Sequence, residues 1–293
     1  MAQDNGDLAR TPAEGARITR ILHTIHATRA VDPLRRTYLH VFGGLAFSQE
    51  YHAGEDRDMA LIYVADHMIE PMAPRRPDEP DTTMSRYLVK YGPGWHSLAF
   101  ATDDAAETSR RVRAAGARLT TDYPGPPGFF FVHPEATGGV VVEVTDYRMT
   151  NDPFDEPSWS PDWAAARTRQ PARLRCPVLV VRDLAPALAF FAGALDGRVV
   201  DQSRREWPEP AACARVAIGD GEILLLAPLG SEGRLTDVLA RPFSGVYALA
   251  WEVRDLAATC AWLAENGLAP ERTPDGAEVI VEGARHWLLP VGG

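Results

Sequence analysis

Three ionisable residues of this sequence are flanked by hydrophobic residues and could do chemistry together. They are His23, Glu70 and Glu143. An unpaired charge in apolar surroundings is costly, so a bound metal or a hydrogen-bonded cavity would compensate for it. Imidazole and carboxylate ligands together suit a divalent transition metal. The alternative is that Glu70 and Glu143 stand at strand ends and face solvent.

The composition predicts a globular protein with many strands. Of the 293 residues, 45% are hydrophobic, which is enough for a core in each of two ordinary domains. The 24 Gly and 24 Pro residues lie mostly between short apolar runs, which is typical of turns and short strands. A helical bundle is therefore not expected.

Charge and cysteine content exclude several classes of protein. The net charge of −10 argues against a nucleic-acid-binding surface. The sequence has neither an apolar stretch of about 18 residues nor an apolar segment of the signal-peptide kind, so we expect no membrane-spanning or secreted protein. The three cysteines are far apart and predict no disulfide framework, which fits a reducing cytoplasm best.

One pattern of strands and helices recurs along the chain. Residues 18–72 are predicted to form a strand, a helix and three further strands, and the same order returns over 95–145. Two more openings of this kind occur later, in LRCPVLVVRDLAPALAFFAGALDGRVV and VYALAWEVRDLAATCAWLAENGL. Internal repetition of this kind indicates a modular fold. We predict an α+β protein built from four β-α-β-β-β modules.

The modules group into two domains, at 18–147 and 173–293. Between them, residues 148–172 are rich in Pro and Trp and show no clear periodicity, so we interpret them as a connector. Trp159 and Trp163 in this connector are expected to pack against one domain as a clasp or to cover a cavity as a lid.

The first half closely resembles the methylmalonyl-CoA epimerase and glyoxalase I members of the vicinal-oxygen-chelate superfamily. The likeness is carried, over roughly residues 20–146, by HTIHATRAVDPLRRTYLHVFGG, MIEPMAP, YLVKYGPGWHSLAFATDD and FVHPEATGGVVVEV. It implies two tandem vicinal-oxygen-chelate domains, each made of two modules whose first and last strands supply the ligands of a divalent metal. The second half resembles the family only in its β-α-β openings.

By this resemblance, His23, Glu70 and Glu143 occupy three of the four metal-ligand positions. The family's fourth ligand is a histidine directly before an Ile-Ala-Phe type run, where this chain has Ser97, and His96 comes one residue too early. Neighbouring side chains of a regular strand face opposite ways. The uninterrupted alternation after Ser97 favours a regular strand with Ser97 facing the cavity, whereas a bulge near Gly94 would make His96 the fourth ligand.

The remaining histidines and aromatic residues have simpler interpretations. His26 is expected on the opposite face from His23, in packing or at an interface, and His40 and His67 are expected at the surface. His133 is assigned a structural role or a place at the cavity rim. Phe129, Phe130 and Phe131 are expected to be core residues, with an apolar wall of a cavity as the alternative.

The second half lacks metal-type residues at the corresponding positions. These positions hold Cys176, Leu224, Ala248 and a residue within 286–289. One thiol among apolar residues does not make a site for a hard cation. We therefore predict a metal-free second domain in which Cys176 is a buried thiol.

Two classes of function follow from the resemblance. The first is an isomerase, epimerase or lyase with a divalent ion (Mn, Fe, Co, Ni or Zn). It would act on a small carbonyl or carboxylate substrate through an enolate-type intermediate, with Glu143 or Glu70 as the catalytic base. The second is a metal-free binding protein for small molecules, like the bleomycin-resistance members. A dioxygenase is a further alternative, but extradiol dioxygenases carry their iron ligands in the C-terminal pair of modules. A homodimer is an open expectation for either class.

Overall fold

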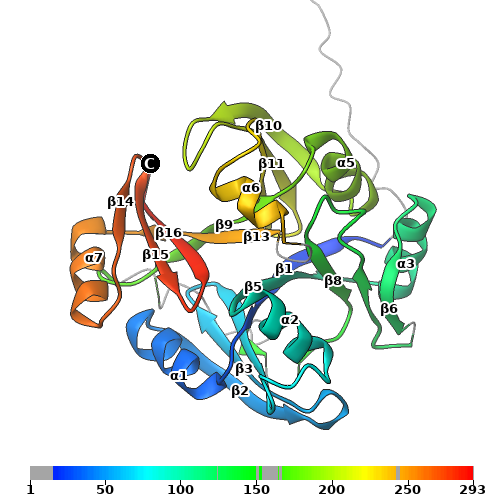
Figure 1. Ribbon diagram of the computed structural model, residues 1–293. Helices are drawn as coiled ribbons and strands as arrows, with labels where there is room; N and C mark the ends of the chain where they lie inside the picture. Colours follow the sequence, from blue (N-terminus) through cyan, green and yellow to red (C-terminus); the bar gives the residue numbers. More distant parts are fainter. Residues whose placement is uncertain are drawn as a thin grey trace, which may run out of the picture.

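The computed structural model describes residues 16–123, 125–149, 152–153, 164, 167–241 and 245–292. Each half of the chain forms its own eight-stranded mixed sheet with helices packed against it (Figure 1). The strand orders are β2-β3-β4-β1-β5-β8-β7-β6 and β10-β11-β12-β9-β13-β16-β15-β14. The two orders are equivalent position by position, so the prediction of two α+β domains with the same modular topology is confirmed.

In the first domain, the two modules meet along β1 and β5, which pair antiparallel. Its strands are β1 (Ile18–Ala27), β2 (Leu45–His52), β3 (Arg57–Val64), β4 (His67–Pro74), β5 (Gly94–Thr102), β6 (Leu119–Tyr123), β7 (Phe129–Val132) and β8 (Val141–Thr145). Its helices are α1 (Val31–Arg36), continued by the π-helix η1 (Thr37–Val41), the 3-10 helix η2 (Ala53–Glu55), α2 (Thr83–Tyr91) and α3 (Ala105–Ala114).

In the second domain, β9 and β13 form the corresponding antiparallel pair. Its strands are β9 (Arg173–Val180), β10 (Arg198–Arg205), β11 (Ala211–Ile218), β12 (Gly221–Pro228), β13 (Val246–Val253), β14 (Glu271–Thr273), β15 (Gly276–Val281) and β16 (Ala284–Pro290). Its helices are α5 (Leu184–Leu188), continued by the π-helix η4 (Ala189–Ala194), α6 (Arg234–Leu239) and α7 (Leu256–Glu265).

Helix α2 covers one face of the first sheet, which we call its inner face. The helix begins at a reciprocal capping box, in which Thr82 and Ser85 each bond the backbone N–H of the other. Its buried residues Met84 and Leu88 form an apolar cluster with Ile25 of β1 and Met72 of β4. This helix joins the two modules and was not predicted from the sequence. It shields part of the inner face from water.

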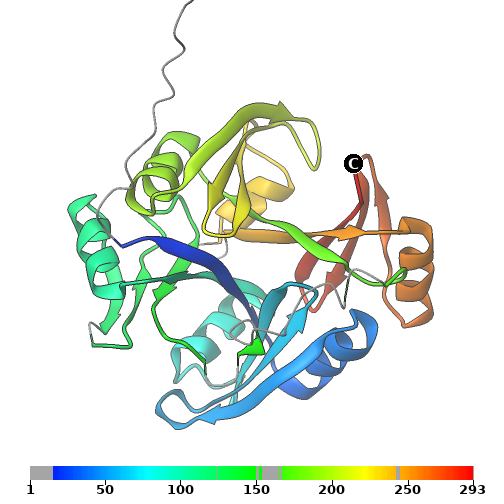
Figure 2. The same ribbon diagram turned by 180° about the vertical axis from the view of Figure 1, so that it is seen from behind.

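The opposite, outer faces of the two sheets share one hydrophobic core with α1, η1, α3, α5, η4 and α7, whereas α6 packs on the inner face of the second sheet. Helix α7 lies beside the α1–η1 segment, and α3 lies beside η4, as both ribbon views show (Figures 1 and 2). The Trp262 indole donates a hydrogen bond to the Val41 carbonyl at 2.9 Å, and the Arg111 guanidinium donates to the Ala194 carbonyl at 2.7 Å. Each domain thus completes the outer layer of the other.

A chain of buried hydrogen bonds crosses this shared core. The Trp251 indole contacts His286 Nδ1 at 3.0 Å, and His286 Nε2 lies 3.3 Å from the Tyr38 hydroxyl. That hydroxyl lies 2.7 Å from His26 Nδ1, and His26 Nε2 lies 3.2 Å from the Glu282 carbonyl. The expectation that His26 serves an interface is confirmed.

Two aspartates also tie the domains together in a symmetrical way. The Asp66 carboxylate, in the β3–β4 turn, accepts a hydrogen bond of 2.6 Å from the backbone N–H of Leu174 in the second domain. The Asp220 carboxylate, in the equivalent β11–β12 turn, accepts one of 2.9 Å from the backbone N–H of Ile21 in the first. Each domain therefore caps the first strand of the other.

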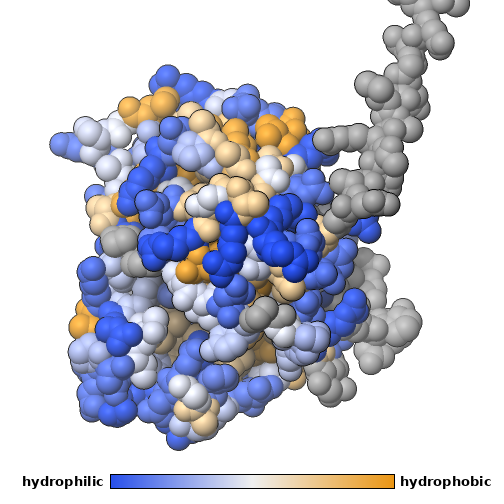
Figure 3. Space-filling view, turned by 90° about the vertical axis from the view of Figure 1, so that its right-hand side faces the viewer, coloured by the Kyte–Doolittle hydropathy of each residue, from blue (hydrophilic) through white to orange (hydrophobic). Residues whose placement is uncertain are grey.

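The described helices and one face of the surface bear on contact with membranes and partners. Among the described residues, none of the helices combines the length and the apolar character that crossing a bilayer requires. On the face turned to the viewer in Figure 3, hydrophilic residues predominate and hydrophobic ones occur in small groups. The homodimer therefore stays a prediction.

Candidate functional site

The inner face of the first sheet brings three of the candidate metal ligands together. His23 on β1 is 3% exposed, and Glu70 on β4 is 4% exposed. His23 Nε2 lies 3.2 Å from a Glu70 carboxylate oxygen and 3.4 Å from a Glu143 oxygen on β8. The Glu143 side chain is 15% exposed, so the cluster reaches solvent on its side. Neither glutamate is a strand-end residue facing solvent.

The donors of this cluster suit a divalent metal in type, and the two distances from His23 suit one in length. Two atoms bound to one metal at about 2 Å lie roughly 3 to 3.5 Å apart, the range of both distances from His23. Neither nitrogen of the buried His23 ring makes a hydrogen bond of acceptable geometry. Within the described ranges, however, no three His, Cys, Asp or Glu side chains already surround a common centre. The donors are adjacent and unsatisfied without forming a finished shell.

The electrostatics of the cluster favour added positive charge. Burial acts to lower the pKa of His23, but the carboxylates of Glu143 and Glu70 outweigh it and the pKa is raised. Burial also raises the pKa of Glu70, and the charge of His23 opposes that rise. Two buried carboxylates facing one imidazole are stabilised by a proton or by a cation.

The fifth strand is not regular, so that expectation was wrong. In the pairing of β1 with β5, Ile25 lies opposite Ser97 and the next residue, His26, lies opposite Trp95. His96 is therefore the extra residue of a β-bulge, which follows Gly94 at a φ of 146°. A bulge lets consecutive side chains point to the same side of a strand.

His96 and Ser97 both lie on the inner face as a result. His96 Nδ1 and the Ser97 hydroxyl lie 3.1 Å apart, and the His96 ring packs edge-on against Tyr87 of α2, with ring centres 4.7 Å apart. Burial lowers the pKa of His96 to about 4, and the charge of Glu143 acts in the opposite sense. The neutral ring thus lies on the same face as the carboxylates, within the influence of the charge of Glu143.

The same bulge occurs in the second domain. In the pairing of β13 with β9, Val246 lies opposite Leu179 and Ala248 lies opposite Val178, which leaves Tyr247 as the extra residue. The two segments are similar in sequence, GWHSLA from 94 to 99 and GVYALA from 245 to 250. An internal alignment of the two halves places His96 opposite Tyr247, although it does not by itself reveal the bulge.

The strand register locates the second-domain counterparts of the cluster. His23 pairs with Ala99 on β5 as Cys176 pairs with Ala250 on β13. By the same comparison Glu70 corresponds to Leu224, and Glu143 corresponds to Trp287. Leu224 and Trp287 belong to an apolar cluster, and Cys176 packs against it. Burial raises the pKa of Cys176 to about 12, so its thiol stays protonated.

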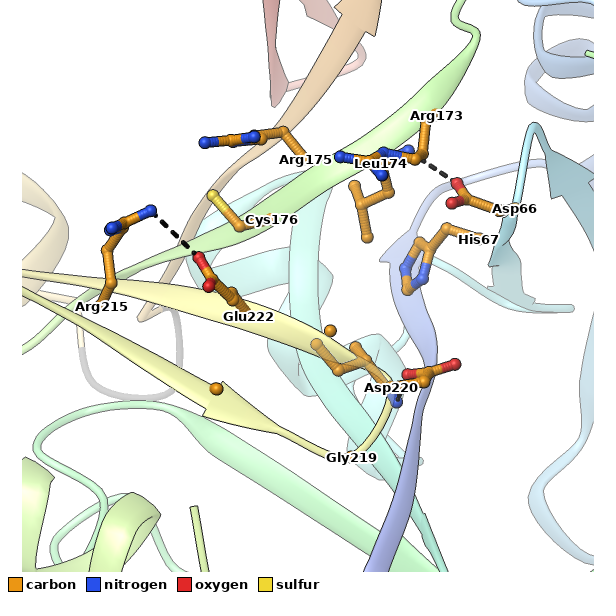
Figure 4. A pocket seen from close by; sticks show the side chains of 13 residues that line it. Asp66, His67, Arg173, Leu174, Arg175, Cys176, Arg215, Gly219, Asp220 and Glu222 are labelled. Carbon is orange, nitrogen blue, oxygen red and sulfur yellow. Dashed lines mark hydrogen bonds and ion pairs between the residues drawn. The ribbon is translucent and has the colours of Figure 1, made fainter. Parts of the chain in front are cut away.

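Cys176 is only half-buried, contrary to expectation, because it lines a pocket of about 450 Å³ between the domains. Figure 4 shows this pocket with its arginine and acidic side chains. Arg215 pairs with Glu222 at 3.3 Å, and Arg173 and Arg175 both pair with Glu252. The charges lining the pocket are thus matched within the protein, and it does not contain the His23 cluster.

A second polar group beside the site was not found by sequence reasoning. The Tyr63 hydroxyl donates a hydrogen bond of 2.6 Å to Asp152 and accepts one of 2.7 Å from Arg20. Arg20 also pairs with Asp152 at 3.5 Å, and its charge acts on His23. Asp152 belongs to the predicted connector, which therefore contacts the first domain here. The signal for this contact is weak, since one aspartate in an irregular segment has no periodicity.

Other predicted positions have mixed outcomes. His67 is buried and lies 2.9 Å from the Thr24 hydroxyl, so its assignment to the surface was wrong. His40 is exposed as predicted. His133 accepts a bond from the Glu135 backbone within its own turn, in agreement with a structural role. Phe130 is a core residue, whereas Phe129 and Phe131 are half-buried. Trp159 and Trp163 lie outside the described residues.

Comparison with protein families gives a match in each half of the chain. A family described as "Glyoxalase-like domain" matches residues 22–154. One described as "Glyoxalase/Bleomycin resistance protein/Dioxygenase superfamily" matches residues 178–281. No curated protein matches the sequence.

Some solved structures resemble nearly the whole chain, and others resemble about half of it. A 4-hydroxymandelate synthase mutant from Streptomyces coelicolor is 16% identical with a TM-score of 0.68, and the alignment covers 94% of each chain. Methylmalonyl-CoA epimerase from Mycobacterium tuberculosis is 27% identical with a TM-score of 0.40, over 46% of this chain and 92% of the epimerase. The first comparison shows that this order of two domains occurs in another protein.

Proposed function

Since this chain belongs to the vicinal-oxygen-chelate superfamily, with a glyoxalase-type domain in each half, we propose that its first domain is a metal-dependent isomerase, epimerase or lyase. Its substrate would be a small carbonyl or carboxylate compound. The observation that carries the proposal is the meeting of His23, Glu70 and Glu143 on the inner face, where Nε2 of His23 lies 3.2 Å and 3.4 Å from the two carboxylates without a well-aligned hydrogen bond.

Four residues would hold the metal, namely His23, Glu70, Glu143 and His96. Nitrogen and carboxylate donors of this kind suit Mn, Fe, Co, Ni or Zn. When bound, such an ion supplies Lewis-acid stabilisation of negative charge on substrate oxygens.

The two glutamates differ in their suitability as the catalytic base. Glu143 is the more exposed, at 15% of its side chain, and a group that takes a proton from a substrate must be within its reach. Glu70 is more deeply buried and its pKa is raised by that burial, so it holds a proton more readily. We assign proton abstraction beside the carbonyl to Glu143 and a supporting role to Glu70. Helix α2 excludes water from the inner face beside them.

Metal-free binding of a small molecule is the second candidate, and the second domain supports it. There the positions of His23, Glu70, His96 and Glu143 are taken by Cys176, Leu224, Tyr247 and Trp287, which offer neither imidazole nor carboxylate. An inner face of this kind would bind an apolar compound without converting it.

Metal binding of the purified full-length protein tests the proposal. We expect a single Mn²⁺ or Co²⁺ ion per chain by calorimetry, and elemental analysis would identify the resident metal. His23→Ala should weaken this binding by more than about 100-fold, since loss of an outer-shell partner alone costs about 10- to 100-fold. Cys176→Ala, the matched change in the second domain, should leave it unaltered. Wild-type protein that binds no divalent ion, or that binds it equally after His23→Ala, would contradict the proposal.

A further inference from the structure

Arg57 is a half-buried cation at the edge of the candidate site with incomplete bonding. Its side chain is 19% exposed, and its Nε is buried without a hydrogen-bond partner. One Nη pairs with Glu55 at 2.8 Å, but that carboxylate is 53% exposed. The same nitrogen lies 2.8 Å from the Met72 sulfur, which is a weak acceptor. Most of the donor capacity of this guanidinium is therefore unused by strong acceptors.

The charge of Arg57 is directed towards the cluster. Arg57 begins β3, the strand that pairs with β4, and Met72 lies two residues beyond Glu70 on β4. The charge of Arg57 acts to lower the pKa of both Glu70 and His96. The charge of the Arg57 guanidinium thus acts on both Glu70 and His96, which lie on the same inner face.

Arg20, on the other side of His23, makes a useful contrast. Its guanidinium donates to the Tyr63 hydroxyl and pairs with Asp152. Arg20 is therefore neutralised within the protein, whereas the nearest partner of Arg57 faces solvent. If a divalent ion balances Glu70 and Glu143, the Arg57 guanidinium, whose carboxylate partner among the described residues is exposed to solvent, can exchange that partner for a ligand.

We propose that Arg57 binds a carboxylate of the substrate, and that the site selects small anionic 2-oxo or 2-hydroxy acids over neutral carbonyl compounds of the same size. This inference rests on the proposed function, since it concerns the same site. Guanidinium groups bind carboxylates through charge-assisted and often bidentate hydrogen bonds, which a ketone oxygen does not match. A carboxylate would also give the Nη nitrogens a stronger acceptor than the Met72 sulfur.

Two ligands of nearly equal size distinguish the effect of a negative charge on binding from the effect of two adjacent oxygens. 2-Oxobutyrate and 2,3-pentanedione both carry adjacent oxygens, but only the first is an anion. Calorimetry on the Mn²⁺-loaded full chain should show 2-oxobutyrate binding more tightly by at least about 10-fold. Arg57→Met should weaken the affinity for 2-oxobutyrate by about 10- to 100-fold, the range expected for a lost charged hydrogen bond. The affinity for 2,3-pentanedione should change by less than about 2-fold. Arg57→Lys should recover part of the affinity.

Matched variants keep the test interpretable. Glu55→Gln removes the competing carboxylate and should bind 2-oxobutyrate as tightly as wild type or more so. Mn²⁺ affinity and melting temperature should stay near wild type in Arg57→Met, which shows that the fold and the metal ligands are intact.

The possible failures are distinguishable. Selectivity for 2-oxobutyrate that depends on Arg57 but not on Mn²⁺ would contradict the metal-dependent function and leave the carboxylate subsite standing. Three results would overturn the carboxylate subsite. They are equal affinity for the two ligands, an equal loss of affinity for both in Arg57→Met, and no binding of either ligand at millimolar concentration.

Discussion

The two domains have nearly the same backbone and different chemistry on their inner faces. Both have the same strand order, the same bulge after a glycine and the same aspartate in the turn that caps the partner domain. Since Tyr247 occupies the bulge in a domain with apolar counterparts of the cluster, the bulge belongs to the fold and is not itself a sign of a metal site. The functional evidence lies in the side chains.

Buried carboxylates show this difference most clearly. Glu278 of the second domain is 3% exposed and is bonded by Arg234, Arg285 and the Trp287 indole. In the first domain, Glu70 and Glu143 each form an ion pair with His23. A carboxylate with a structural role is surrounded by donors, and those of the first domain leave room for a ligand.

The largest effect on stability should come from Trp287, which occupies in the second domain the position that Glu143 occupies in the first. Trp287 is 1% exposed, its ring lies 4.6 Å from that of Trp207, and its indole bonds Glu278 at 3.1 Å. Trp287→Ala should lower the free energy of unfolding by about 3 to 5 kcal/mol, through the cavity and the lost donor. Glu143→Ala should lower it by less than about 1 kcal/mol in metal-free protein, because no filled core is lost. Urea unfolding followed by circular dichroism would measure both, and equal losses would contradict the functional reading of Glu143.

The next largest effect should be a dependence of the unfolding free energy on pH, caused by the capping aspartate Asp66. Burial raises the pKa of Asp66 to about 6, so the folded state holds this proton more tightly than the unfolded state. Stability should therefore rise as the pH falls from about 7 towards 4. Asp66→Asn keeps an acceptor oxygen for Leu174 and should remove this dependence, raising the unfolding free energy at pH 7 by up to about 3 kcal/mol. Unfolding of wild type and Asp66→Asn between these pH values would test it; parallel pH profiles would show that Asp66 is not responsible.

The smallest effect concerns the two bulge residues. His96→Ala should weaken Mn²⁺ binding by about 10-fold, since one neutral ligand is lost while three donors remain. This reverses what a regular strand would predict, in which His96 would be irrelevant and Ser97→His would strengthen binding. Tyr247→Phe, at the same bulge of the second domain, should not change metal affinity. Calorimetric titrations of the two variants decide the matter, and an unchanged affinity in His96→Ala would limit the metal shell to the other three residues.

Much of the fold could be predicted because its information is repeated within the chain. The four strand-and-helix openings were sufficient to predict two modular domains, and the family resemblance predicted that His23, Glu70 and Glu143 share one site. The bulge could not be predicted from alternation, since Leu98, Ala99 and Phe100 alternate normally once His96 has been passed. Only the strand pairing reveals the extra residue.

The remaining failures arise from long-range contacts. His67 follows a turn and has a surface-like sequence context, but Thr24 of the adjacent strand and the second domain bury it. Arg57 and Arg20 look alike in the sequence, and only their partners, Glu55 and Asp152, distinguish an unsatisfied cation from a paired one.

The buried chain of bonds between the domains has a fixed direction. An indole N–H can only donate, so His286 accepts through Nδ1 and must donate through Nε2 to the Tyr38 oxygen. The Tyr38 proton is then left for His26 Nδ1, and His26 Nε2 donates to the Glu282 carbonyl. Both imidazoles are thus neutral and each is locked in a single tautomer. The chain passes from the second domain to the first between His286 and Tyr38, and back again between His26 and Glu282. A domain that replaced either half would therefore have to present the same donor or acceptor at both of these crossings.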